Sequence, residues 1–136
     1  MNRTFYGYER PDGKFGARNY VAIIPSVVCA NEVAESIERQ TVNTRCYCHH
    51  QGCCQLPPDL ERVTKALIGL GLHPNVGACL IVSLGCEGTD VDLLEETLRA
   101  SGKPVERVNI QEIGGMSPAI QNGIQKVQKM QMQIFQ

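Results

Sequence analysis

The chain has 136 residues, of which 43% are hydrophobic and 20% charged, and its formal net charge at pH 7 is −1. That length suits one domain with a real core and is too short for two, while the balanced charge provides no basic surface for nucleic acid or for an anionic membrane. No apolar run approaches the ~20 residues of a membrane-spanning helix, and the first residues lack the apolar segment of a signal peptide, so we expect a cytoplasmic protein.

Residues 1–18 are expected to form an irregular leader or a short hairpin, ahead of a single α/β domain over residues 19–136. Pro11-Asp12-Gly13 is a turn sequence, because proline fixes φ, aspartate caps the turn locally and glycine accepts positive φ. Within the domain, apolar or alternating segments predict strands at residues 20–24, 40–48, 78–84 and 105–110.

Segments with apolar residues at helical spacing alternate with these strands. The central strand, residues 78–84, is apolar apart from Ser83, which is typical of a strand buried on both faces of a parallel sheet. We therefore predict a three-layer α/β fold of the flavodoxin or Rossmann kind, with a mostly parallel four-stranded sheet and helices on both faces. The apolar helix positions are Ala30, Val33, Ala34 and Ile37; Val63, Ala66, Leu67 and Leu70; Val91, Leu94 and Leu98; and Ile120, Ile124 and Val127.

Residues that could carry chemistry follow every predicted strand. In a parallel sheet the carboxyl ends of the strands lie along one edge, and open α/β sheets bind their ligands there. Side chains far apart in the sequence are therefore expected to meet in one crevice. They are Cys29 after the first strand, His49 and Cys53 after the second, Cys86 and Glu87 after the third, and Gln111 with Glu112 after the fourth.

The chain contains seven cysteines, and an odd number argues against a closed disulfide framework. Cys29, Cys53 and Cys86 stand near the starts of predicted helices, where a thiol pKa is lowered and the sulfur becomes a better metal ligand or nucleophile. Three such thiolates could hold iron and leave one coordination position open for substrate, although their spacing matches no zinc pattern. Cys79 lies in the central strand and is expected to be a small buried hydrophobe.

Several short motifs also follow one another in a recognisable order. They are Gly7-Tyr8, Arg10-Pro11-Asp12-Gly13-Lys14, Gly16-Ala17-Arg18-Asn19-Tyr20, Pro25-Ser26-Val27-Val28-Cys29-Ala30-Asn31, His49-x-x-Gly52-Cys53, His73-Pro74-Asn75, Leu84-Gly85-Cys86-Glu87 and Gln111-Glu112-Ile113-Gly114-Gly115. In this combination the chain resembles the altronate and galactarate dehydratase family of sugar-acid dehydratases, specifically the domain just ahead of their large C-terminal domain. Each motif is unspecific by itself, whereas the set over residues 7–115 is specific.

The resemblance implies a hydro-lyase that uses iron, as Fe²⁺ or an iron–sulfur cluster, to remove water from a hexonate or hexarate and form a 2-keto-3-deoxy acid. In such a reaction a base removes the proton α to the carboxylate while an acid or a metal helps the β-hydroxyl to leave. Residue type assigns roles to the matched positions. These are metal ligation for Cys29, Cys53 and Cys86; acid–base chemistry for His49 and Glu87; and substrate binding for Arg18, Asn19, Asn31 and Gln111.

The resemblance also implies partners besides the sugar acid. The family's large C-terminal domain and its small N-terminal domain or subunit have no counterpart in these residues, so we expect a fragment of a longer enzyme. The Gln- and Met-rich residues 128–136 contain no helix stop signal, which indicates a continuing chain or a packing partner, and a homo-oligomer is one such arrangement.

Other functions stay open at this stage. The main alternative is a non-catalytic flavodoxin-like module that binds a small anion or a partner chain through the same edge. A nucleotide site is less favoured because no glycine-rich phosphate motif follows a strand. A thiol redox enzyme is less favoured still, because Cys53 and Cys54 are adjacent and no Cys-x-x-Cys occurs; Cys46 and Cys48 lie in the second predicted strand. A related sulfo-lyase activity also fits the resemblance.

Overall fold

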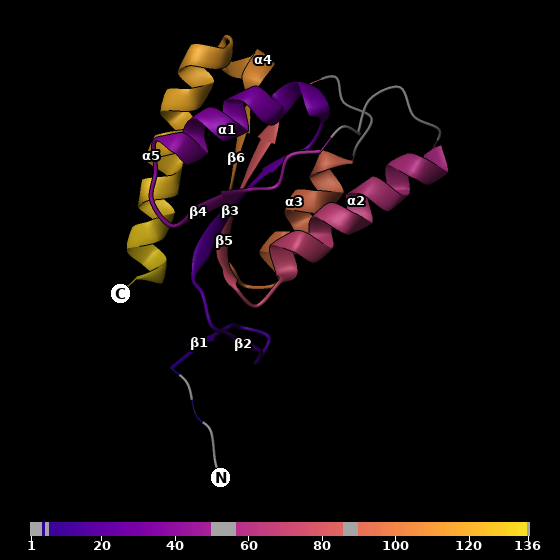
Figure 1. Ribbon diagram of the computed structural model, residues 1–136. Coiled ribbons are helices and arrows are strands. Elements are labelled where there is room, and N and C mark those ends of the chain that lie inside the picture. Colours follow the sequence, from indigo (N-terminus) through magenta and orange to yellow (C-terminus); the bar gives the residue numbers. More distant parts are fainter. Residues whose placement is uncertain (1–3, 5, 50–56, 86–89, 136) are drawn as a thin grey trace.

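A four-stranded parallel sheet forms the centre of the computed structural model, which describes residues 4, 6–49, 57–85 and 90–135 (Figure 1). The strand order is β4-β3-β5-β6. The strands are β3 (Tyr20–Pro25), β4 (Thr44–Cys46), β5 (Val76–Ser83) and β6 (Val105–Asn109). All three pairings between neighbouring strands are parallel. The predicted three-layer α/β fold is therefore confirmed.

The two middle strands, β3 and β5, are buried on both faces. Every residue of β5 is buried, and so is every residue of β3 after Tyr20. Apolar side chains alternate between the two faces: Val21 and Ile23 enter one core, and Ala22 and Ile24 enter the other. Continuous apolar runs are what two covered faces require.

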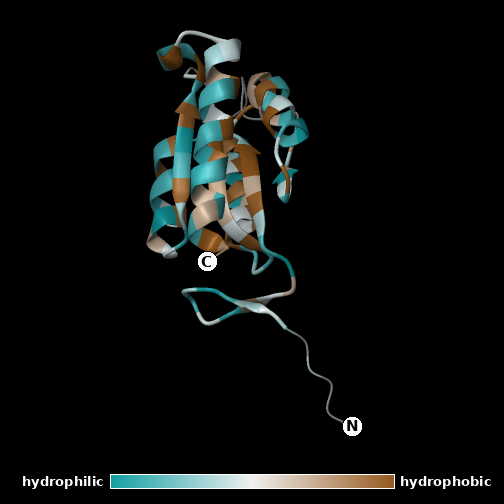
Figure 2. Ribbon diagram, turned by 90° about the vertical axis from the view of Figure 1, so that its left-hand side faces the viewer, coloured by the Kyte–Doolittle hydropathy of each residue, from teal (hydrophilic) through white to brown (hydrophobic). Residues whose placement is uncertain are grey.

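Helices cover both faces of the sheet (Figure 1). On one side lie α1 (Asn31–Arg39) and α5 (Met116–Ile134), and on the other lie α2 (Pro57–Leu72) and α3 (Val91–Ala100). The short elements η1 (Val28–Ala30) and α4 (Ile110–Ile113) follow the ends of β3 and β6. Figure 2 shows hydrophobic residues concentrated on the strands between these layers. No helix among the described residues is long and apolar enough to span a membrane.

The strand order places a change of direction between β3 and β5. From β3 the chain crosses to β4 through α1, and from β5 it crosses the opposite way to β6 through α3, on the other face of the sheet. Connections that leave neighbouring strands in opposite directions open a crevice at the carboxyl ends, where sheets of this kind bind ligands. The carboxyl ends of β3 and β5 are therefore the first place to look for a site.

Two predicted boundaries were wrong. The second strand begins only at Thr44, because Asn43 takes a left-handed φ of 55° and ends a turn that leaves Val42 74% exposed. The last helix begins at Met116, whereas the hydroxyl of Ser117 followed by Pro118 predicts a capping residue one position later; the N-cap is instead Gly115. Packing of the helix against the sheet determines its start more than the local capping signal does.

A separate two-stranded hairpin lies beyond the amino end of the sheet (Figures 1 and 2). Its strands are β1 (Tyr8–Glu9) and β2 (Phe15–Gly16). The buried guanidinium of Arg10 fastens it: Nε donates to Pro74 O at 2.6 Å, Nη1 to Asn19 Oδ1 at 2.8 Å and Nη2 to Arg18 O at 2.8 Å. Burial lowers the pKa of Arg10, but an arginine stays charged at physiological pH.

The hairpin reaches the domain through a glycine that admits no side chain. A Cβ on Gly16 would lie 2.0 Å from Pro74 O and 2.5 Å from Pro74 C, and both are backbone atoms. We therefore predict that Gly16→Ala lowers the free energy of unfolding, measured in urea, by roughly 1–3 kcal/mol.

Gly69→Ala is the matched control for this substitution. Gly69 lies on the exposed side of α2, and a Cβ added there would have no heavy atom within 4 Å. Alanine at this position should therefore stabilise the protein by about 0.5–1 kcal/mol through helix propensity. If Gly16→Ala were as stable as the parent protein, the close approach of Gly16 to the Pro74 backbone would be contradicted.

Candidate functional site

The candidate site begins at the carboxyl end of β3. The strand ends at Pro25, and the chain turns through η1, which exposes the thiol of Cys29, into α1, which begins at Asn31. The backbone N–H of Ser26 donates to Val82 O at 2.9 Å. The end of β3 is thus joined to the end of β5.

His49 lies against the same turn, although it follows β4. Its Nε2 is 2.7 Å from the carbonyl oxygen of Pro25. Because a carbonyl only accepts, this contact places a ring proton on Nε2. The carbonyl of His49 in turn accepts a hydrogen bond of 2.7 Å from Asn31 Nδ2. The sheet edge therefore holds His49 at both its ring and its backbone.

Asn31 acts here mainly as a positioning residue. Its amide donor is used by His49, and its Oδ1 is buried with no hydrogen-bond partner among the described residues. The predicted contact of Asn31 with substrate stays a prediction. A buried acceptor without a donor is costly, so Oδ1 is a point at which a donor from outside the described residues would add stability.

The ends of β5 and β6 are joined in the same way. Gln111 N–H donates to Leu84 O at 3.1 Å. Gly85 has φ +123°, and a Cβ at this position would lie 2.5 Å from Gln111 Oε1. The glycine that ends the central strand therefore allows both the turn and the close approach of the Gln111 side chain.

The structure brings together part of the predicted set. Cys29, Asn31 and His49 surround the end of β3, and Gln111 lies beside the end of β5. Cys53, Cys86 and Glu87 lie outside the described residues. Within the described part of the chain, no group of three or more His, Cys, Asp or Glu side chains is arranged to hold a metal ion.

Arg18 and Asn19 lie at the other end of the sheet, just before β3 begins. The Asn19 side chain is buried, accepting from Arg10 and donating to Ile134 O at 3.0 Å, and the Arg18 carbonyl accepts from Arg10. Arg18 and Asn19 therefore lie at the edge of the sheet opposite Cys29 and His49, and their predicted substrate binding stays a prediction. A strand puts the residues before it and after it at opposite edges, and residue type carries no information on which edge is used.

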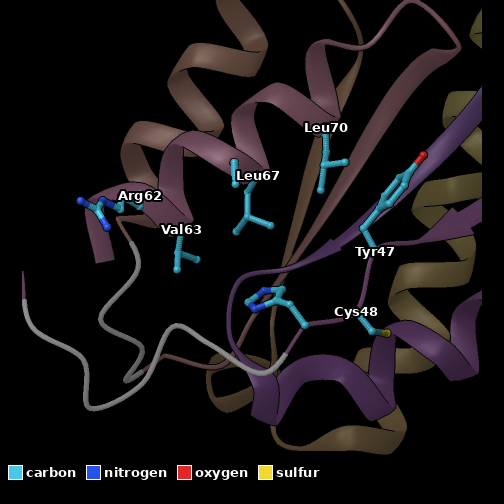
Figure 3. A pocket seen from close by; sticks show the side chains of 8 residues that line it. Tyr47, Cys48, Arg62, Val63, Leu67 and Leu70 are labelled. Atoms are coloured by element: carbon cyan, nitrogen blue, oxygen red, sulfur yellow. The ribbon is translucent and has the colours of Figure 1, made fainter. Parts of the chain in front are cut away.

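Sequence reasoning did not anticipate a cavity beside His49. It has a volume of about 540 Å³ and lies between α2 and the segment after β4 (Figure 3). Ala66 and Leu70, both on the predicted apolar face of the helix, line this cavity: Ala66 is exposed, and the half-buried Leu70 also packs against the core. The lining residues are Tyr47, Cys48, His49, Arg62, Val63, Ala66, Leu67 and Leu70. The apolar face of this helix is wider than the part that contacts the sheet, and this excess width is the sequence signal that could have predicted the cavity.

Comparison with known proteins identifies the family of this chain. The family described as "D-galactarate dehydratase/Altronate hydrolase, second domain" matches residues 7–134. The chain belongs to this family. The resemblance read from the motifs is thus confirmed.

Three relatives are much longer proteins. An altronate dehydratase of Bacillus subtilis is 32% identical over 133 residues, which cover 90% of this chain and 26% of the relative. The beta subunit of a (2R)-sulfolactate sulfo-lyase of Chromohalobacter salexigens is 37% identical over 114 residues, covering 82% and 28%. An altronate dehydratase of Escherichia coli is 36% identical over 101 residues, covering 67% and 20%. The second domain described here thus spans about a quarter of their length and belongs to a lyase family.

Gly85 provides a test of how the site edge is built. We predict that Gly85→Ala destabilises the second domain by roughly 1–3 kcal/mol, because alanine disfavours the positive φ and its Cβ meets the Gln111 side chain. Adding Gln111→Ala should recover part of the loss, since it removes the contact but not the backbone strain. The measurement is a double-mutant cycle of unfolding free energies, with Gln111→Ala as the second single variant. If the losses of the two single variants simply add up in the double variant, the predicted contact between Cβ at position 85 and the Gln111 side chain is refuted.

Proposed function

We propose that this second domain contributes part of the active site of a metal-dependent hydro-lyase that dehydrates a sugar acid of the altronate or galactarate type to a 2-keto-3-deoxy acid. The observation that carries the proposal is the meeting of Cys29, Asn31 and His49 at one strand end, in a chain of a dehydratase family. The remaining active-site residues would come from the other domains of a longer enzyme and from Cys53, Cys86 and Glu87.

His49 is the proposed acid–base residue. Its Nε2 is held by Pro25 O, and the imidazole is the group that would take the proton α to the substrate carboxylate. Asn31 holds the His49 backbone and keeps the ring in place. The elimination also requires a donor for the departing β-hydroxyl, and the enediolate formed between the two steps requires positive charge or hydrogen-bond donors.

Iron is the proposed cofactor, and the chemistry of the donors is what supports it. The Cys29 thiol is exposed at the site edge, and thiolates are ligands that iron favours. Cys53 and Cys86 would complete the ligand set from outside the described residues. When bound, iron would act as a Lewis acid on the departing hydroxyl group.

A second reaction is favoured by one observation. The relative with 37% identity is named as a sulfo-lyase subunit rather than a dehydratase. We therefore keep, as the second candidate, an elimination from a hydroxy acid in which a sulfonate group leaves in place of water. The first step, removal of a proton by His49, is the same in both reactions.

Iron content provides the first test. We expect protein purified without oxygen to contain iron, and to absorb in the visible range where that iron forms an iron–sulfur cluster, because charge transfer to ferric iron in a cluster produces such bands. Cys29→Ser should lower the iron content, whereas Cys79→Ala, which removes a fully buried thiol of β5, should not. Metal-free protein in every case would overturn the iron proposal and favour a non-catalytic module.

Loss of activity on replacing His49 provides the second test. With the further domains of the longer relatives supplied, we expect His49→Gln to lower kcat for elimination by ~10²–10⁴. His73→Gln is the control, because His73 lies at the amino end of the sheet, just after α2. A panel of aldonates, aldarates and sulfonated hydroxy acids distinguishes the two candidate reactions, and an unchanged kcat in a stably folded His49→Gln would exclude the acid–base role.

A further inference from the structure

Two cysteines at the end of β4 lie unusually close together. The sulfur atoms of Cys46 and Cys48 are 2.8 Å apart, whereas a disulfide bond measures about 2.05 Å. Cys46 is the last residue of β4 and half-buried, and Cys48 is exposed. Cys48 lies two residues beyond the end of β4, and the two thiols meet at the surface.

The surroundings of the pair come from α1. Glu35 Oε1 lies 3.4 Å from the Cys48 sulfur, and Glu38 Oε2 accepts the N–H of Cys46 at 2.5 Å. Figure 3 shows the Cys48 sulfur pointing away from the cavity, towards this helix. Within the described residues these groups do not make up a metal site. Two thiols within reach of each other, one of them open to solvent, are what reversible disulfide formation requires.

We propose that Cys46 and Cys48 form a reversible dithiol–disulfide pair, oxidised by low-molecular-weight disulfides such as oxidised glutathione and reduced again by thiols. Nothing in the family description or in the names of the relatives assigns such a modification. The proposal does not depend on the dehydratase function.

The reaction proceeds by two exchanges. The Cys48 thiolate attacks one sulfur of oxidised glutathione, so a mixed disulfide forms and one glutathione thiolate leaves and takes up a proton. Cys46 then loses its proton and attacks the Cys48 sulfur, which forms the internal disulfide and releases the second glutathione. The two cysteines are oxidised, and one glutathione disulfide is reduced to two thiols.

Accessibility and hydrogen bonding assign the first attack to Cys48. Its sulfur is exposed, and the Cys46 thiol is placed to donate to it. Burial is the main effect that raises the pKa of both thiols, while the contact with Cys46 acts on Cys48 in the opposite direction. Cys46 is the more buried of the two, which suits the resolving role.

Oxidation of the pair would also affect the geometry of the candidate site. This consequence rests on the proposed function. Tyr47 lies between the two cysteines, bonds through its N–H to Ile23 O at 3.1 Å and lines the cavity with His49. A bond between residues 46 and 48 constrains this segment and so acts directly on the position of His49.

The test uses the whole chain carrying Cys53→Ser and Cys54→Ser, which removes the two other thiols from the tryptic peptide that begins after Arg45. Folding of this variant is first checked by circular dichroism. After exposure to oxidised glutathione and blocking of free thiols, mass spectrometry should show the peptide lighter by two hydrogen atoms, without a glutathione adduct and without blocking groups. Dithiothreitol should restore both reactive thiols completely.

Single substitutions make the outcome decisive. Cys46→Ser should lose the internal product and accumulate glutathione on Cys48, while Cys48→Ser should react far more slowly. Cys29→Ser should leave the internal disulfide unchanged. Separate glutathione adducts on both cysteines, or no reaction of the pair while Cys29 is modified, would overturn the proposal. None of these readouts involves dehydratase activity, so failure of one proposal is distinguishable from failure of the other.

Discussion

The parallel pairing of β3 with β5 is the constraint on which the rest of the domain depends. Both strands are covered on both faces, so each must be apolar along its length, and parallel pairing sends both carboxyl ends to one edge. Their connections then leave in opposite directions, with α1 on one face and α3 on the other. A crevice for chemistry follows from this topology before any particular side chain is considered.

The site edge is held together mainly by backbone carbonyls. Pro25, Val82, Leu84 and His49 all supply carbonyl acceptors there. Because main-chain atoms of buried strands hold His49 and Gln111, the site geometry depends on the core and less on neighbouring side chains. This is the arrangement expected when a rigid scaffold positions residues that lie in loops. Oxidation of the Cys46–Cys48 pair would act on this arrangement from its outer edge.

The opposite end of the sheet serves a different purpose. There the motif residues Arg10, Gly16 and Asn19 join the hairpin to the turn after α2 and to the last helix. Motif residues at this end are explained by docking of the hairpin, so their presence in a family motif is no sign that they contact substrate. The hairpin exposes Tyr8 and Phe15.

The sequence by itself determined the layers of the fold, because a strand that is buried on both faces, such as β5, must be a continuous apolar run. It also determined the edge of the sheet at which chemistry is expected, because parallel strands all point one way. It also placed Cys29, His49 and Gln111 after strand ends, where the structure has them. Only the tertiary structure decided that Arg10 and Asn19 fasten the hairpin, that Asn31 holds His49, and that the sulfur atoms of Cys46 and Cys48 meet. The first two outcomes depend on hydrogen bonds between separate segments and the third on the backbone conformation after β4, and local sequence patterns specify neither.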